Sequence, residues 1–520
     1  MSKTIDPDDV RRKVCIQVAK KGYSESIALE AYEATETDAQ KAGDLDTSFN
    51  DARKRRTARV LEYLTASNPQ EQKAPETPAQ DEGAEGNEDG DDVTIPAGSK
   101  MLGLRSKAAR SIWNSAVAAE VPEQHAKVEN WKMGSVSAEL LRMQLTKKLR
   151  NKLFKACEKQ KVTVPLLCFE RWMSRSKLLE QKAVEPHSEP LLPALGQRDK
   201  GLIKDLVRAK MDEAAAAAVA DQMALSSQEA VNRIAALASE TQSEPKVCVS
   251  ASKHMLHFAL GSDGAKPYLE LNKHHYTKLL EMYRRSTNAG AQEVDLEKFH
   301  AHVWLLLARY AALQGHGYQA ALTNLGFDVL LKAMSVKMEC FASPLNCRYA
   351  VFCSAFPDTD GCFGSVGSFF STRLTEGSYE ANPPFVPEVM SQMGMHMEDL
   401  LKKATKPLSF TVLVPSWTDL PYFKKLEASS FKRASFTVPA KDHTFCDGAQ
   451  HQRLTRERFR PSSFDTTVFV MQNEAGLQEW PVPLMLEADL RAAMSVVKGR
   501  GGTLSLEEME QRNKDHPKGG

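Results

Sequence analysis

The sequence predicts an α/β doubly wound domain over about residues 333–490, preceded by a helical region and followed by a frayed tail over residues 491–520. After Val336, short apolar runs (VKMECFA, SFTVLVP, SFTVP and TTVFVMQN) alternate with helical or turn-rich segments, as a sheet covered by helices requires. Before that point, apolar residues recur at helical spacing. The 520 residues, 42% of them apolar, are enough for two to four domains.

The first 66 residues are expected to form a small helical module. Val10, Val14 and Val18 recur four residues apart, which indicates a helix. The segments GYSESIALEAYEAT and RTARVLEYL that follow resemble a three-helix ubiquitin-associated domain, and a generic helical bundle is the competing interpretation. Residues 67–99 carry almost no large apolar side chain, so they are predicted to form a disordered acidic linker.

Residues 100–332 are predicted to be helical and basic. Leucines recur every four residues from Leu141 to Leu153, and Phe154 is a further core candidate. The inserted segment MDEAAAAAVADQMAL is a strong helix former, which we interpret as a packing arm or spacer. Tyr276 and Trp304 belong to an aromatic stripe that is more typical of a core than of a cofactor site.

The net charge of +1 conceals a segregation of charge along the chain. Residues 67–92 contain nine acidic residues and one basic residue, whereas residues 142–182 contain twelve basic and three acidic residues. A concentrated basic region is the electrostatic footprint of a polyanion partner. A solvated helix face is the alternative interpretation.

Several classes of protein are excluded by the sequence. Nine cysteines without a CxxC pair argue against a disulfide framework or a zinc ribbon. The spacing of His443, Cys446 and His451 matches no zinc pattern, so no metal site is predicted. No run of 18 apolar residues occurs and the N-terminus is charged, so we expect an intracellular chain without a membrane span or a signal peptide.

The tetrapeptide Asn382-Pro383-Pro384-Phe385 is the sharpest local signal. At the end of a strand, this motif resembles the active site of adenine and cytosine amino-methyltransferases. An exocyclic amine is a weak nucleophile, so a site favours attack when it accepts hydrogen bonds from the N–H groups. The Asn382 side-chain carbonyl and the Pro383 backbone carbonyl are the expected acceptors, and Phe385 is expected to stack on the base. A Pro-Pro turn capped by Asn is the competing interpretation.

Longer segments extend this resemblance, among them ECFASPLNCRYAVFCSAFPDTDGCFGSVGSFF, HHYTKLLEMY, HVWLLLARY and PLSFTVLVPSW. Over about residues 273–473, the chain resembles the phosphorylated-CTD-interacting-factor family of cap-specific adenosine N6-methyltransferases. The resemblance implies a Rossmann-like methyltransferase domain with S-adenosyl-L-methionine as cofactor. It further implies methylation at N6 of the first transcribed (2′-O-methyl)adenosine beside the 7-methylguanosine cap of mRNA, RNA binding, and a location in the nucleus.

The resemblance also implies the residues of the cofactor site. The segment that begins at Phe341 stands where ordinary methyltransferases have a Gly-rich turn. An acid in PDTDG is expected to pair with the ribose hydroxyls, with Asp358 preferred over Asp360 and an Asx-turn as the alternative. The expected cofactor contacts are Phe341, Ser343, Pro344, Asn346, Asp358 and Asn382, and the catalytic motif is Asn382, Pro383, Pro384 and Phe385.

A second set of residues is expected to contact the substrate. Trp417 resembles a substrate residue of the family, with a core position as the alternative, and Glu388 is expected to replace an acid that the family favours at Pro387. Cations of the basic region are expected to face the cap phosphates. They include lysines on one helical face and three arginines: Lys148, Lys152, Lys155, Lys159, Arg142, Arg150 and Arg171.

One departure from the family bears on the partners of the chain. Family members linked to the polymerase tail carry an N-terminal WW module with two tryptophans in about forty residues, whereas the first tryptophan here is Trp113. We therefore predict that the chain lacks the WW domain, which puts recruitment to the RNA polymerase II machinery in doubt. A catalytically silent RNA-binding scaffold, and an N6-adenine methyltransferase of internal RNA or DNA adenine, are the alternative functions.

Overall fold

The computed structural model divides the chain into two compact units, Met1–Asn87 and Glu88–Gly520. Most of the predicted N-terminal module and of the acidic linker lies outside the described residues. The finer domain boundaries inferred from the sequence remain predictions. The structure describes residues 10, 14, 32, 35, 55–60, 93–94, 105–106, 134–165, 167–180, 189–239, 244–261, 269–287, 294–313, 320–453 and 459–495.

A six-stranded sheet forms the centre of the C-terminal part, in the order β10-β13-β9-β8-β6-β7. The neighbours from β7 to β9 pair in parallel, whereas β13 is antiparallel to both β9 and β10. All eight residues of β9 are buried, as expected for a strand covered on both faces. The strands are β6 (Met338–Ala342), β7 (Phe352–Ser354), β8 (Gly377–Ala381), β9 (Leu408–Pro415), β10 (Lys432–Val438) and β13 (Thr466–Gln472).

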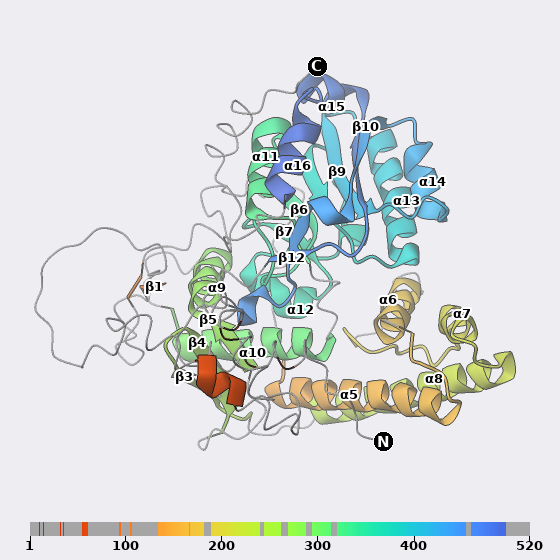
Figure 1. The fold of residues 1–520 in the computed structure, drawn as a ribbon, viewed down its shortest axis with the longest axis vertical. Coiled ribbons are helices and arrows are strands. Elements are labelled where there is room, and N and C mark those ends of the chain that lie inside the picture. The colour runs from red at the N-terminus through yellow and green to blue at the C-terminus, as the bar shows by residue number, and fades with distance from the viewer. Residues whose placement is uncertain are drawn as a thin grey trace, which may run out of the picture. The chain divides into compact units, whose positions relative to one another are not determined.

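Helices pack against both faces of this sheet (Figure 1). On one face lie α11 (Asn324–Met334) and α16 (Leu486–Met494). On the other lie α13 (Pro387–Lys403) and α14 (Pro421–Glu427). The predicted α/β class is therefore confirmed, and the four apolar runs named above become β6, β9, β10 and β13.

The region before the sheet is mainly helical but not entirely so. A three-stranded antiparallel sheet interrupts it, because VCVSA and MLHFAL place apolar side chains on extended backbone rather than at helical spacing. The prediction of helix throughout residues 100–332 is wrong there. The helices are α5 (Val136–Lys159), α6 (Cys168–Glu180), α7 (Lys200–Arg208), α8 (Glu213–Ser239), α9 (Lys273–Ser286) and α10 (Leu296–Leu313), and the strands are β3 (Val247–Ala251), β4 (Met255–Leu260) and β5 (Leu269–Asn272).

Smaller elements complete the described structure. The helix α15 (Glu474–Glu479) follows β13, and α12 (Pro357–Asp360) follows β7. Two short antiparallel pairs are formed by β1 (Val93–Thr94) with β2 (Arg105–Ser106), and by β11 (Thr444–Cys446) with β12 (Phe459–Pro461). None of the helices in these residues combines the length and the apolar character needed to cross a lipid bilayer.

The predicted helical core is largely confirmed. Leu145, Leu149 and Leu153 are buried, and the Ala-rich helix α8 packs against α5 through small side chains such as Ala216. Phe154 is the exception, because its side chain lies on the outer face of α5 and is 46% exposed. All the described cysteines are free thiols, and all but Cys248 are buried.

A buried ion-pair network joins the helical region to the sheet domain. Arg309 of α10 donates to both carboxylate oxygens of Glu139 in α5, at 2.8 Å each. It also donates to both oxygens of Asp358 in α12, at 3.0 and 2.8 Å. Glu139 pairs in turn with Arg142, which donates to Glu189 at 2.9 Å. Burial alone would lower the pKa of Arg309, but the two carboxylates raise it well above its usual value, so this buried guanidinium stays charged.

A second buried feature is a pair of carboxyl groups on adjacent strands. The parallel register of β6 and β8 places Glu339 directly beside Glu380, and both are buried. Burial raises the pKa of Glu339 to about 7, and the backbone N–H groups of Arg348 and Tyr349 oppose that rise. Burial and the neighbouring charge of Glu339 raise the pKa of Glu380 further above its usual value. Both effects favour the protonated form of Glu380.

We expect substitution of Arg309 to destabilise the fold strongly. Arg309→Ala leaves the buried carboxylate of Glu139 without its principal partner, which costs about 3–5 kcal/mol of unfolding free energy. Urea denaturation measures this loss. Arg285→Ala, which breaks an exposed ion pair with Glu281, is the control and is expected to cost less than about 1 kcal/mol. A similar loss for both variants would contradict the structural role of the network.

The carboxyl pair predicts a pH dependence of stability. A carboxyl group with a raised pKa in the folded state stabilises the fold most at low pH, and this contribution is lost as the pH rises. The free energy of unfolding should therefore fall between about pH 5 and pH 8. Glu380→Gln, which mimics the protonated group, should reduce this fall by up to about 1.4 kcal/mol per pH unit.

Urea denaturation across this pH range tests the expectation. Glu479→Gln, a substitution of an exposed carboxyl group without an ion pair among the described residues, is the matched control and should follow the unsubstituted protein. Equal slopes for Glu380→Gln and the unsubstituted protein would rule out Glu380 as a source of the pH dependence.

Candidate functional site

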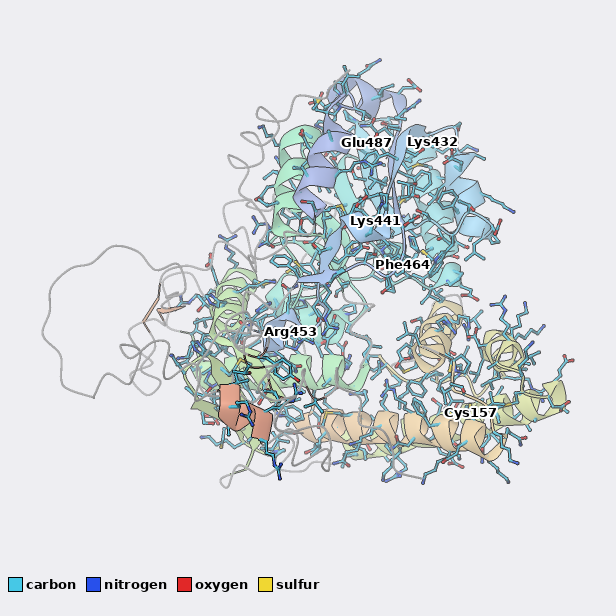
Figure 2. The ribbon with its side chains drawn as sticks, in the orientation of Figure 1. Cys157, Lys432, Lys441, Arg453, Phe464 and Glu487 are labelled. Atoms are coloured by element: carbon cyan, nitrogen blue, oxygen red, sulfur yellow. The ribbon has the colours of Figure 1, made fainter. Side chains whose placement is uncertain are left out.

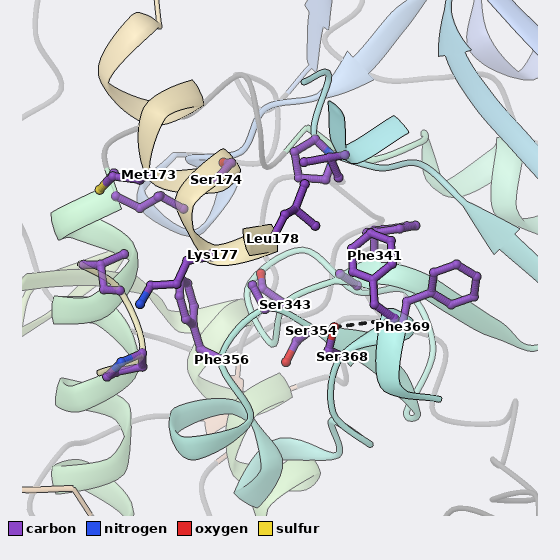
Figure 3. Close-up of a pocket in the computed structure, with 18 of the residues that line it drawn as sticks. Met173, Ser174, Lys177, Leu178, Phe341, Ser343, Ser354, Phe356, Ser368 and Phe369 are labelled. Carbon is purple, nitrogen blue, oxygen red and sulfur yellow. Dashed lines mark hydrogen bonds between the residues drawn. The ribbon is translucent and has the colours of Figure 1, made fainter. Parts of the chain in front are cut away.

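A cavity of about 280 Å³ lies at the carboxyl ends of β6, β7 and β8 (Figure 3). The sheet edge contributes one side, and α6 with the segment after it contributes the other. Five of the predicted residues meet here although they are far apart in sequence. These are Phe341, Ser343, Asn346, Asn382 and Pro384.

The turn after β6 is fixed without glycine. The backbone N–H and the hydroxyl of Ser343 both donate to Asn346 Oδ1, at 2.7 and 3.0 Å. Glu339 accepts the N–H groups of Arg348 and Tyr349, and Lys278 Nζ donates to the carbonyl of Cys347 at 2.7 Å. Every residue in this turn has a negative φ, so glycine is not required. Pro344 is buried inside the turn and does not line the cavity.

The Asn382 motif directly follows β8, and Asn382 and Pro384 line the cavity, whereas Pro383 is buried and neither Pro383 nor Phe385 belongs to the lining. Asn382 Nδ2 donates to the backbone carbonyl of Ala320 at 3.1 Å, and Oδ1 has no hydrogen-bond partner among the described residues. The carbonyl of Pro384 accepts the N–H of Val386, whereas the carbonyl of Pro383 has no partner in the described chain. Both acceptors that the sequence analysis named are therefore without an internal donor among the described residues.

Aromatic rings continue from this motif. The ring of Phe385 packs edge-on against Phe464, with centroids 5.2 Å apart, and Phe464 packs against Trp417 at 6.0 Å. Trp417 is half-buried, packs against the core of the sheet domain and does not line the cavity. Phe464 lies at the end of the sheet nearest α6 (Figure 2).

Sequence analysis missed Phe464. Its position follows from the antiparallel pairing of Thr466 with Pro415, which brings the residues before β13 beside those after β9. Phe464 could have been identified only from the order of the strands in the sheet. A local sequence motif does not contain that information.

The prediction that Asp358 contacts the cofactor is wrong in one respect, because Asp358 does not line the cavity. Both oxygens of Asp358 accept from Arg309. Asp360 is fully buried and accepts the hydroxyl of Tyr310 at 2.7 Å. Burial raises the pKa of Asp360 to about 7. Tyr310 lines the cavity. Asp360 therefore influences the cavity only through its hydrogen bond with the Tyr310 hydroxyl.

The prediction that Arg142 and Arg150 face RNA is wrong. Both are buried, because each guanidinium compensates an internal carboxylate. Arg142 donates to Glu189, and Arg150 donates to Glu170 at 3.0 Å. Neither presents a free donor face to solvent.

The remaining two predicted contacts also lie outside the cavity lining. Arg171 is partly exposed and pairs with Asp205 at 3.2 Å, so it is placed in an ion pair between α6 and α7. Glu388 is exposed in the first turn of α13, beside Val389, which does line the cavity.

Residues of α6 form the opposite wall, and sequence analysis did not identify them. Figure 3 shows Ser174, Lys177 and Leu178 of this helix facing the turn that carries Ser343. Lys177 Nζ donates to Glu180 at 2.6 Å and to the carbonyl of Glu189 at 2.7 Å. Burial lowers the pKa of Lys177, opposed by the charge of Glu180.

Comparisons with known proteins point to one family. The family model described as phosphorylated CTD interacting factor 1 WW domain matches residues 278–448. Two proteins named mRNA (2′-O-methyladenosine-N(6)-)-methyltransferase, from Homo sapiens and Mus musculus, are each 38% identical to this chain over 234 residues. The match covers 43% of this chain and 33% of each relative, so it spans about a third of the length of these curated relatives.

The family match corrects the prediction that the chain lacks the WW domain. The domain of that description lies at residues 278–448, not at the N-terminus. The prediction failed because it required two tryptophans within about forty residues. The matched segment has two, Trp304 and Trp417, but they lie much farther apart in the sequence. The segment extends from α9 through β6, β8 and β9 to β11, and so includes both the turn after β6 and the Asn382 motif.

Proposed function

We propose that this chain transfers a methyl group from S-adenosyl-L-methionine to N6 of the first transcribed adenosine beside an mRNA cap. The observation that carries the proposal is the pair of available acceptors, Asn382 Oδ1 and the Pro383 carbonyl, at the edge of a cavity in an α/β sheet. The relatives named for this reaction support it, and the family-model match at residues 278–448 includes the turn after β6 and the Asn382 motif, which form the sheet side of the cavity.

The sheet layout supports a Rossmann-like methyltransferase domain. Beginning at β6, the chain builds the sheet outward in both directions, to β7 on one side and to β8 and β9 on the other. Ligands of open α/β sheets bind where the strand order reverses, at the carboxyl ends of the strands. The cavity lies at this point, between the ends of β6 and β8.

The residues of the cavity fit S-adenosylmethionine in kind. The aromatic side chains of Phe341, Phe356 and Phe369 suit a flat base, and the hydroxyls of Ser343 and Ser354 suit polar groups of a ribose or an amino acid. When bound, the cofactor supplies an electrophilic methyl group on sulfur. Glu339 and Lys278 hold the turn after β6, which would contact the cofactor, through hydrogen bonds to its backbone.

Asn382 orients the amine that accepts the methyl group. Its Nδ2 is held by the Ala320 carbonyl, so Oδ1 is directed by a fixed amide plane rather than by a free rotor. Oδ1 and the Pro383 carbonyl accept the two N–H groups of adenine, which favours electron density on nitrogen. The rigid prolines limit movement of both acceptors. Phe385, supported by Phe464, provides a surface for the base.

Capped mRNA is the proposed partner, and the nucleus is the proposed location. A family model described by interaction with the phosphorylated CTD matches this chain, which supports proximity to RNA polymerase II, where caps are formed.

Mass spectrometry of nucleosides tests the substrate. The protein is incubated with labelled S-adenosylmethionine and RNA that begins with adenosine, bearing either a 7-methylguanosine cap or a bare triphosphate. We expect N6-methyladenosine only at the first position of the capped RNA. Label at internal positions, or in both RNAs, would replace the cap-specific function with a general adenine methyltransferase, and label in neither would favour a silent RNA-binding scaffold.

Substitution of the amine acceptor tests the mechanism. Asn382→Ala removes one of two hydrogen bonds to the reacting amine, and we expect kcat to fall by about 10²–10³-fold. RNA affinity should change by less than about threefold, because phosphate contacts dominate it. The matched control is Gln392→Ala on α13, which does not line the cavity. An unchanged kcat for Asn382→Ala would overturn the assigned role.

A further inference from the structure

The outer face of α5 carries a continuous stripe of exposed residues. From Gln144 onward these recur three or four positions apart, and at 100° per residue they fall within an arc of about 140°. The opposite side of the helix is buried against α8 and α10. The exposed stripe consists of Gln144, Lys147, Lys148, Asn151, Phe154, Lys155, Glu158 and Lys159.

The lysines of this stripe are not neutralised by the fold. Lys147, Lys148, Lys155 and Lys159 make no ion pair with any described residue, and Glu158 is the single acid on the stripe. Lys152, at its margin, donates to the hydroxyl of Ser226 instead. The arginines of the same region are all paired internally, so most of the unpaired positive charge among its described residues lies on this face, with Lys161 just beyond the end of the helix.

Phe154 gives the stripe a second property. Its ring is 46% exposed and lies at one edge of the stripe, on the same side of the helix as Lys147 and one residue before Lys155. An exposed aromatic ring among unpaired cations is the combination that single-stranded nucleic acid recognises, because bases stack on rings while lysines contact phosphates. A face that served only for solubility would gain nothing from a large exposed apolar ring.

The stripe is separate from the cavity. The cavity is lined by Met173, Ser174, Lys177 and Leu178 of α6 but by no residue of α5. In Figure 1, α6 lies between α5 and the sheet. A polyanion that contacts α5 is therefore not the group that reacts in the cavity.

We infer that the exposed face of α5 binds the single-stranded RNA that continues from the cap, and so makes affinity depend on RNA length. This inference rests on the proposed function. The cap-proximal nucleotide lies at the edge of the cavity beside Asn382, and the phosphates of later nucleotides lie along the lysines of α5. The role is to hold RNA without reading its sequence, since lysines act as point charges.

A fourfold substitution tests the charge. Lys147→Gln, Lys148→Gln, Lys155→Gln and Lys159→Gln are combined, and a second variant combines Lys253→Gln, Lys337→Gln, Lys402→Gln and Lys424→Gln as the control. The control lysines are exposed and unpaired among the described residues, but lie on other elements. Both variants remove four charges, so they separate the α5 face from net charge.

Fluorescence anisotropy with capped RNA of about 20 nucleotides and with a capped trinucleotide provides the readout. For the α5 variant, we expect affinity for the long RNA to fall at least about tenfold and the slope of log K against log salt to fall by about 3. Trinucleotide affinity should be unchanged, and the control should behave as the unsubstituted protein. Methylation of the trinucleotide, measured in parallel, should also be unaffected.

Phe154→Ser tests stacking separately. It should weaken binding of the long RNA about fivefold without changing the salt slope, because a neutral ring releases no counterions. An unchanged affinity would remove the aromatic part of the inference.

Equal or tighter binding of long RNA by the α5 variant would overturn the inference. The proposed function can fail independently. If no RNA is methylated, the anisotropy comparison still decides whether α5 binds RNA.

Discussion

The buried guanidinium of Arg309 is the contact on which the arrangement of the site depends. It holds the carboxylates of Glu139 and Asp358 together, one from the helical region and one from the segment after β7. A charge in this environment is tolerated only with such partners, so the three residues are stable as a set and costly when separated. These ion pairs add directional contacts to the apolar core that also runs from α5 and α10 to the segment after β7.

The network extends to the wall of the cavity. Arg142 links Glu139 to Glu189, and Glu189 both lines the cavity and accepts the N–H groups of Leu191 and Leu192. The wall opposite the sheet therefore takes its shape from the same ion pairs that join the domains. The sheet edge and the helical region each supply one wall of the cavity. The sheet alone would therefore leave the cavity open on one side.

Local motifs could be predicted from the sequence, whereas partnerships could not. The turn after β6 and the Asn382 motif lie at strand ends, so their chemistry follows from a few adjacent residues, and both meet at one cavity. Asp358 was assigned to a ribose from the family resemblance, yet the local sequence does not reveal Arg309, which lies 49 residues away in sequence and donates to both of its oxygens. Phe464 escaped detection because only the antiparallel register brings it beside Trp417.

The basic region illustrates the same limit in electrostatic terms. Twelve cations between residues 142 and 182 suggested one polyanion-binding surface, but the fold divides them by type. The arginines Arg142, Arg150 and Arg175 are buried against carboxylates, because a planar guanidinium with five donors can satisfy a carboxylate with two bonds. A lysine keeps its strongly hydrated charge in water while its stem covers the helix. Net charge along the sequence therefore overestimates the charge available to a partner, and the part that remains available lies on the lysine-bearing face of α5.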